Sequence, residues 1–149
     1  MTNKMYFSVS TYLKEDSWIG VPLNYDYWIP LIKHFLKHSN TIEIHCWNEE
    51  QVISDELLLI NEDYTMDVMH GMTIIKTALS PELISQLTTK YLDKTGKIKW
   101  FSLFFYKDGN ITFNSEHWGT EFVVSALNKG EAQTIRSIMP KDTNFHEYE

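Results

Sequence analysis

Hydrophobic and polar residues alternate near the start of the chain, where Met5, Phe7 and Val9 fall on one side of residues 4–12. A period of two residues is typical of a strand that buries one of its faces. Short apolar or alternating stretches predict further strands over residues 41–47, 72–79 and 120–126. We expect these segments to pair in a mainly antiparallel sheet.

Apolar residues at helical spacing predict three helices. The first covers residues 30–38, with Pro30 in its first turn, where a missing N–H group costs nothing. The second begins at Pro81 with Ser80 as its N-cap, and the third covers residues 130–139. The buried stripe of the second helix is expected to consist of Leu83, Ile84, Leu87 and Tyr91.

A hairpin is predicted from residues 98–106 and 111–115, because Asp108-Gly109 suits a tight turn in which both central residues have positive φ. Counting outward from this turn places Phe104 opposite Phe113 on one face. The first strand is apolar on both faces, which is typical of a strand in the interior of a sheet.

Residues 48–70 follow no clear period and could form strand, helix or loop. Within them, residues 57–60 fit a buried strand or a short helix equally well. Strands and helices do not alternate regularly along the chain. We therefore predict one α+β domain over residues 1–149, with about three helices packed on an antiparallel sheet.

Composition excludes several classes of function. The net charge of −7 opposes nucleic-acid binding, which requires cationic side chains to replace counterions. The single cysteine cannot form an internal disulfide, and no glycine-rich phosphate loop is present. We therefore expect no cofactor or metal. We also expect a cytoplasmic protein, because no apolar run could span a membrane and no signal-peptide pattern follows Met1.

Two histidine pairings are candidate sites of chemistry. His34 and His38 share a helical face, but the zinc-protease pattern needs a glutamate where this chain has Phe35. His45 and Cys46 are neighbours in a predicted strand, so their side chains point to opposite faces and cannot form a nucleophile–base pair. We predict a core role for Cys46 and no metal site.

The segment 116–121 offers an alternative, enzymatic function. It contains Glu116, His117 and Glu121, from which the acid and base of a small hydrolase-type enzyme could be assembled, with His45 as another candidate base. The competing interpretation is a solvated loop in which Trp118 covers the edge of the core.

Negative charge is concentrated in one quarter of the chain. Eight acids and no lysine or arginine lie between Lys37 and Lys76, whereas the other twelve acids are interleaved with eleven basic residues. Such a surface is either ordinary solvated surface or one that attracts a basic partner. We predict the second, with the partner-binding residues Glu43, Trp47, Glu49, Glu50, Asp55, Glu56, Glu62, Asp63, Tyr64 and Asp67.

Three features of the sequence together resemble those of a known class of proteins. They are this acidic interval, the five tryptophans and the aromatic hairpin that ends in Trp118-Gly-Thr-Glu-Phe122. The chain resembles the immunity proteins that bacteria pair with polymorphic or contact-dependent toxins. The resemblance implies a non-enzymatic inhibitor that binds the basic cleft of a nuclease-like toxin domain. A phage-encoded inhibitor of a host defence protein fits the same physics, and the oligomeric state stays open.

Overall fold

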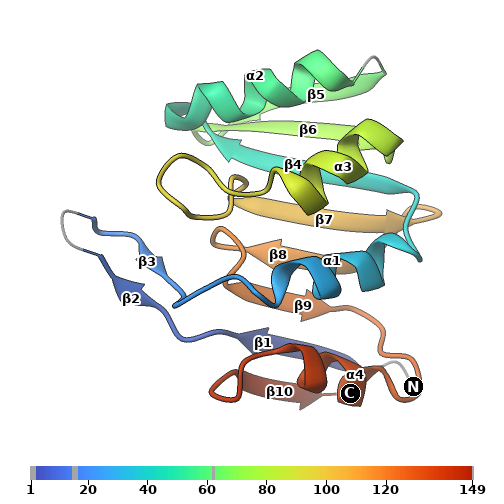
Figure 1. The fold of residues 1–149 in the computed structure, drawn as a ribbon. Helices are drawn as coiled ribbons and strands as arrows, with labels where there is room; N and C mark the ends of the chain where they lie inside the picture. Colours follow the sequence, from blue (N-terminus) through green and yellow to red (C-terminus); the bar gives the residue numbers. More distant parts are fainter. Residues whose placement is uncertain (1–2, 15–16, 62, 149) are drawn as a thin grey trace.

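The computed structural model describes residues 3–14, 17–61 and 63–148, which form an α+β fold built on an eight-stranded antiparallel sheet (Figure 1). From one edge to the other, the strands are β10 (Asn144–Tyr148), β1 (Lys4–Ser8), β9 (Glu121–Val124), β8 (Asn110–Glu116), β7 (Ser102–Lys107), β4 (Thr41–Trp47), β6 (Met72–Ala78) and β5 (Tyr64–Met69). A separate two-stranded sheet, β2 (Tyr12–Leu13) and β3 (Gly20–Val21), projects from one end.

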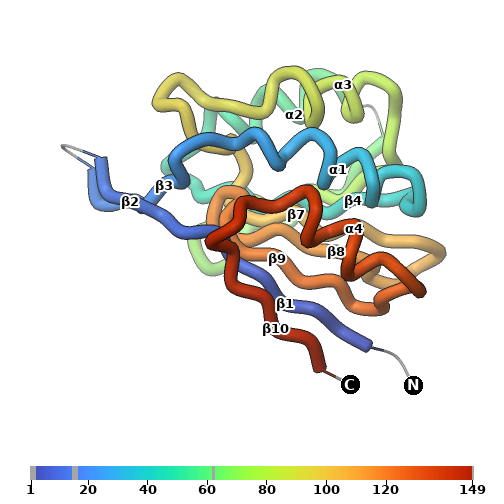
Figure 2. Tube along the Cα trace, turned by 60° about the horizontal axis from the view of Figure 1, so that its bottom comes forward, coloured from blue at the N-terminus to red at the C-terminus, as the bar shows by residue number. Residues whose placement is uncertain are grey.

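The helices of the described chain lie on one face of the sheet and leave the other face bare (Figure 2). They are α1 (Trp28–Leu36), α2 (Gln51–Ile60), α3 (Pro81–Thr89) and α4 (Glu131–Ile138), and the short 3-10 helix η1 (Asn48–Glu50) precedes α2. Of the helices in the described ranges, none has both the length and the apolarity to cross a membrane.

The core lies between the sheet and these helices. Side chains that alternate along the central strands are fully buried there, including Ile44, Phe105 and Phe113. The rings of Phe35 on α1 and Phe113 on β8 stack with their centroids 4.1 Å apart. Helix packing therefore covers one side of each strand, which explains the period of two seen in the sequence.

Several local predictions are confirmed. Strand β4 has the predicted bounds and buries Ile42, Ile44 and Cys46. The hydroxyl of Ser80 accepts a hydrogen bond from the Leu83 N–H, so Ser80 caps α3 as expected. Strand β7 lies inside the sheet, between β8 and β4.

The predicted hairpin register is confirmed next to the turn, where Tyr106 faces Ile111, and is wrong by one residue farther from it. Phe113 faces Phe105, and Phe104 faces Asn114 on the helix-free side. A β-bulge causes this shift in register. Thr112 is an extra residue in β8 between the pairs Phe105–Phe113 and Tyr106–Ile111. One inserted residue moves every later side chain to the opposite face.

Other predictions need smaller corrections. The described chain has four α-helices rather than three, because residues 51–60 form α2. The strand predicted from residue 98 begins only at Ser102, and β5 and β10 were not predicted as strands. Ile84 is 36% exposed, so it contributes little to the buried stripe of α3.

Candidate functional site

The acidic segment folds into the outermost part of the sheet. After β4 the chain passes through η1 and α2 and then forms the edge strand β5 (Figure 1). Ile53 and Leu57 are one turn apart on α2 and are buried, which fixes that helix on the sheet. The opposite side of α2 and most of β5 face solvent.

Three of the predicted partner-binding acids are already engaged within the protein. The carboxylate of Glu50 pairs with Lys97 at 2.8 Å, and that of Glu56 pairs with Lys99 at 2.9 Å. Glu43 lies on the helix-free face of the sheet, 2.8 Å from the ring of His45. The interval contains no lysine or arginine of its own, but the fold brings lysines from a distant segment beside two of its acids, which are therefore not free for a partner.

The remaining described acids of the interval are exposed and form no ion pair with another described residue. We call this surface the acidic edge, and its carboxylates belong to Glu49, Asp55, Asp63 and Asp67. Glu62, also predicted as a partner-binding residue, lies outside the described residues. The acidic edge keeps half of the eight predicted acids, since the others are either paired or not described.

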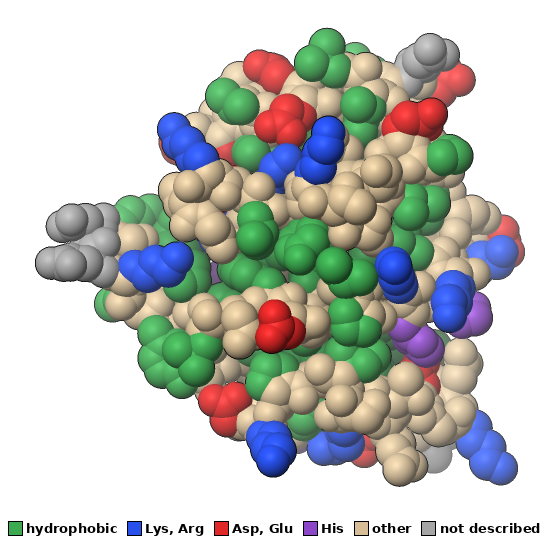
Figure 3. Space-filling view, in the orientation of Figure 1, with side chains coloured by type: hydrophobic (Ala, Val, Ile, Leu, Met, Phe, Trp, Pro, Cys, Tyr) green, Lys and Arg blue, Asp and Glu red, His purple; other side chains and the backbone are tan. Residues whose placement is uncertain are grey.

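Apolar side chains are exposed between these acids. They are Val52, Leu59, Tyr64, Met66, Val68 and Met69, with Leu59 87% exposed and Val68 63% exposed. At the top of Figure 3, over α2 and β5, hydrophobic and acidic side chains lie next to each other. An exposed apolar patch rimmed by charge is typical of an interaction surface.

Trp47, another predicted partner-binding residue, does not lie on the acidic edge. It lines a cavity of about 580 Å³ at the end of the sheet from which the β2–β3 pair projects. We call this cavity the aromatic groove; its lining consists of Trp18, Ile19, Trp47, Glu49, Glu50, Phe101, His117 and Trp118. Sequence reasoning missed this groove because its residues come from four separate segments, and no local pattern joins them.

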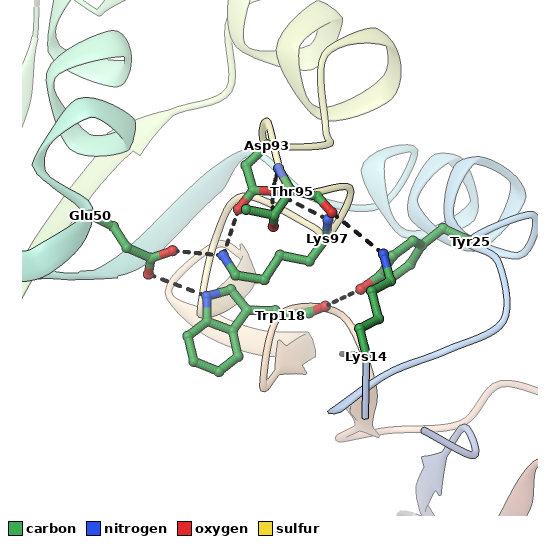
Figure 4. Close-up of polar contacts among 7 residues, drawn as sticks. All are labelled: Lys14, Tyr25, Glu50, Asp93, Thr95, Lys97 and Trp118. Atoms are coloured by element: carbon green, nitrogen blue, oxygen red, sulfur yellow. Dashed lines mark hydrogen bonds and ion pairs between the residues drawn. The ribbon is translucent and has the colours of Figure 1, made fainter. Parts of the chain in front are cut away.

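A partly buried polar cluster lies at the wall of the aromatic groove (Figure 4). The ammonium of Lys97 donates to Glu50 and to Asp93, at 2.8 and 2.6 Å. The indole N–H of Trp118 donates to the second oxygen of Glu50 at 3.2 Å. Glu50 therefore holds both the lysine and the tryptophan in place and is not free to bind a partner with its full charge.

Asp93 has a perturbed pKa in this cluster. Burial acts to raise the pKa of its carboxyl, but hydrogen bonds from Lys97 and Thr95 outweigh burial and lower the pKa below its usual value. The Lys97 side chain is 10% exposed, so the ion pairs that it forms are only weakly screened by solvent.

The turn between β8 and β9 presents His117 and Trp118 to the groove. Both residues have positive φ, 49° and 53°, and Gly119 follows with φ of 75°. A side chain at Gly119 would clash, because its Cβ would lie 2.8 Å from Ile98. Positive φ costs a non-glycine residue about 1 kcal/mol or more, so the packing around this turn must hold it.

The residues of the proposed enzymatic alternative lie close together but differ in their surroundings. The ring of His117 is 3.1 Å from the Glu121 carboxylate, and both side chains are exposed. Glu116 accepts hydrogen bonds from Ser102 and Asn114. The arrangement could support proton transfer between His117 and Glu121, beside a smaller cavity of about 290 Å³.

The other candidate sites of chemistry have structural partners. Cys46 is buried, and burial raises the pKa of its thiol to about 12, which keeps it protonated at neutral pH. The ring of His34 lies 2.7 Å from Glu131 on α4, where it joins two helices. Among the described residues, no three His, Cys, Asp or Glu side chains are placed to hold a metal ion.

The acidic edge and the aromatic groove meet at η1, because Glu49 belongs to both. Together they combine free carboxylates, exposed aliphatic side chains and a hollow with aromatic walls. Comparisons with protein families, curated proteins and solved structures found no match to this chain.

Proposed function

We propose that this protein is a protein-binding inhibitor, an immunity protein that neutralises a nuclease-like bacterial toxin by covering its basic cleft. The observation that carries the proposal is the acidic edge. Four exposed carboxylates without ion pairs to described residues surround exposed apolar side chains of α2 and β5. Charge of this kind speeds encounter with a basic partner, and the apolar side chains slow dissociation.

The acidic edge has the composition of a binding surface with a charged rim. Tyr64, Met66 and Met69 are of the residue types that interfaces concentrate. The edge strand β5 also offers backbone N–H and C=O groups on its outer side, where no described strand pairs with it. A partner strand could add to the sheet there, in addition to side-chain contacts.

The test is co-expression with the toxin-like product of the reading frame next to this gene. Wild-type protein should restore growth of cells that produce the toxin. Reversal of Glu49, Asp55, Asp63 and Asp67 to lysine should abolish this protection, because the cationic cleft would then be repelled.

The matched control reverses four exposed acids elsewhere, Asp26, Glu82, Asp142 and Glu147. It changes the net charge equally and should retain most of the protection. Association of the purified proteins should also slow as salt is raised, since exposed charges are screened over about 8 Å at physiological ionic strength. Equal protection by both reversed variants would contradict the proposal.

A further inference from the structure

The aromatic groove is built as a cluster of rings around Phe101. The Phe101 centroid lies 4.9 Å from Trp47, 4.8 Å from Trp118 and 5.3 Å from His117. Trp118 meets Phe101 nearly edge-on, at an interplanar angle of 75°. The rings are therefore tilted or edge-on to one another rather than stacked face to face.

Trp18 also lines the aromatic groove. It follows the β2 strand and is 85% exposed, although Trp28 and Trp100 in the same protein are almost fully buried. Large aromatic side chains dominate binding energy at interfaces because they bury a large apolar area. The core gives no reason for an exposed tryptophan at this position, whereas a ligand in the groove would cover it.

The charges around the groove favour a cation. Glu49 and Glu50 are the carboxylates that line the groove, and Glu50 is paired with Lys97, so the free negative charge there is that of Glu49. The faces of tryptophan and phenylalanine rings are also negative, and they attract cations within about 6 Å. Glu49 is exposed and forms no ion pair with a described residue, so its carboxylate can accept hydrogen bonds from a ligand.

We propose that the aromatic groove binds an arginine side chain presented by a partner protein. A guanidinium group is planar, is weakly hydrated and stacks on aromatic rings, and its N–H groups can form two parallel hydrogen bonds to one carboxylate. The volume of about 580 Å³ admits the aliphatic stem of the arginine and neighbouring residues of its chain. Lysine, a compact and strongly hydrated charge, fits such a wide apolar hollow less well.

This inference deepens the proposed function and rests on it for the source of the arginine, which is the basic partner. It also extends the binding surface from the acidic edge to the end of the sheet. The partner's arginine would then interact with Glu49, the one carboxylate that belongs to both surfaces.

The experiment titrates isotope-labelled protein with the peptide acetyl-Gly-Arg-Gly-amide and follows the indole N–H signals by NMR. The signals of Trp18, Trp47 and Trp118 should shift, while those of the buried Trp28 and Trp100 should not. A matched peptide with norleucine in place of arginine keeps the apolar stem and lacks the charge. It should bind about tenfold more weakly, and a lysine peptide should lie in between.

Two substitutions at exposed positions test the groove without disturbing the core. Trp18→Ala and Glu49→Gln should each weaken binding of the arginine peptide about three- to tenfold. Their controls on the acidic edge, Tyr64→Ala and Asp63→Asn, should leave it unchanged. Far-ultraviolet circular dichroism of all four variants verifies that the fold is retained.

The proposal is overturned if the groove indole signals do not move, if the norleucine peptide binds as well as the arginine peptide, or if Glu49→Gln weakens binding no more than Asp63→Asn. The growth assay separates the two proposals. Peptide binding without protection from the toxin would leave the groove assignment standing and remove the immunity function. Protection without peptide binding would remove the groove assignment alone.

Discussion

The side chain of Lys97 connects three separate segments of the protein. Its ammonium binds Glu50 and Asp93 and lies 5.0 Å from the centre of the Trp118 ring. These contacts join the loop after α3 to η1 and to the turn between β8 and β9. The lysine therefore stabilises the fold and orients a wall of the aromatic groove.

We expect the stability of the protein to depend on pH through Asp93. Its folded pKa is lowered from 3.8, so its contribution is complete above about pH 5 and is lost as the pH falls through 3.8 towards the folded pKa. Asp93→Asn should cost about 1–3 kcal/mol at pH 7, because Lys97 loses a charged partner.

Urea unfolding of both proteins at several pH values measures this. The difference in unfolding free energy between wild type and Asp93→Asn should shrink as the pH is lowered from 5 to about 3. A difference that stays constant over this range would show that the charge of Asp93 does not stabilise the fold.

A second residue-scale prediction concerns the β7–β8 hairpin. Phe105→Ala should lower the free energy of unfolding by about 3–5 kcal/mol, because its ring is fully buried against Phe113. Phe104→Ala is the neighbouring control. Phe104 is half-buried on the helix-free face beside His45, so about 1–2 kcal/mol is expected for its loss. Chemical denaturation of both variants tests the register, since a larger loss for Phe104→Ala would contradict it.

At the scale of elements, α2 and β5 differ from the rest of the sheet in what they leave exposed. Every described residue of β5 is exposed, whereas the neighbouring strand β6 buries Thr73, Ile75 and Thr77. A strand at a sheet edge with apolar side chains and a single charge, that of Asp67, lacks the lysines and prolines that usually protect such edges. Its composition fits a strand that is covered by a partner.

Val68→Lys tests this role of β5. Val68 is 63% exposed, so the change should alter the free energy of unfolding by no more than about 0.5 kcal/mol. It should nevertheless weaken protection in the toxin assay, because it places a positive charge on the surface proposed to meet a basic partner. Ile111→Lys, at a 39% exposed position remote from this edge, is the control and should retain protection.

In the molecule as a whole, the residues that stabilise the fold and the residues proposed to bind a partner lie in different places. Apolar packing between one sheet face and the helices holds the fold, and the four carboxylates of the acidic edge lie on α2, β5 and the segments that flank them, at one edge of the sheet. The remaining charges are largely mixed in sign along the sequence. Repulsion among the carboxylates of the acidic edge would be relieved by a basic partner.

Folding of the whole chain should not require a metal ion. The described residues hold no group of three metal-ligating side chains, and they bury a continuous apolar core. Thermal melts recorded with and without a chelator should therefore coincide within about 1 °C. A decrease of more than a few degrees on chelation would show that a metal contributes to the fold.

Short-range rules were sufficient for many parts of this structure. The alternation in residues 41–47 predicted the inward side chains of β4, because successive residues of a strand point to opposite faces. The Ser80 cap followed from the chemistry of a helix start. The acidic interval was also visible in the sequence, since charge can be counted without knowing the fold.

Tertiary structure alone decided which of those charges are free and what lies beside them. Lys97 is 47 residues from Glu50, and Trp118 is 68 residues from it, so no local pattern pairs them. The bulge at Thr112 and the edge position of β5 likewise depend on which strands pair. The sequence determined the periodicity, the caps and the charge, which depend on neighbouring residues. The aromatic groove and the acidic edge could not be predicted from the sequence. They depend on contacts between segments that are far apart along the chain, which only the tertiary structure brings together.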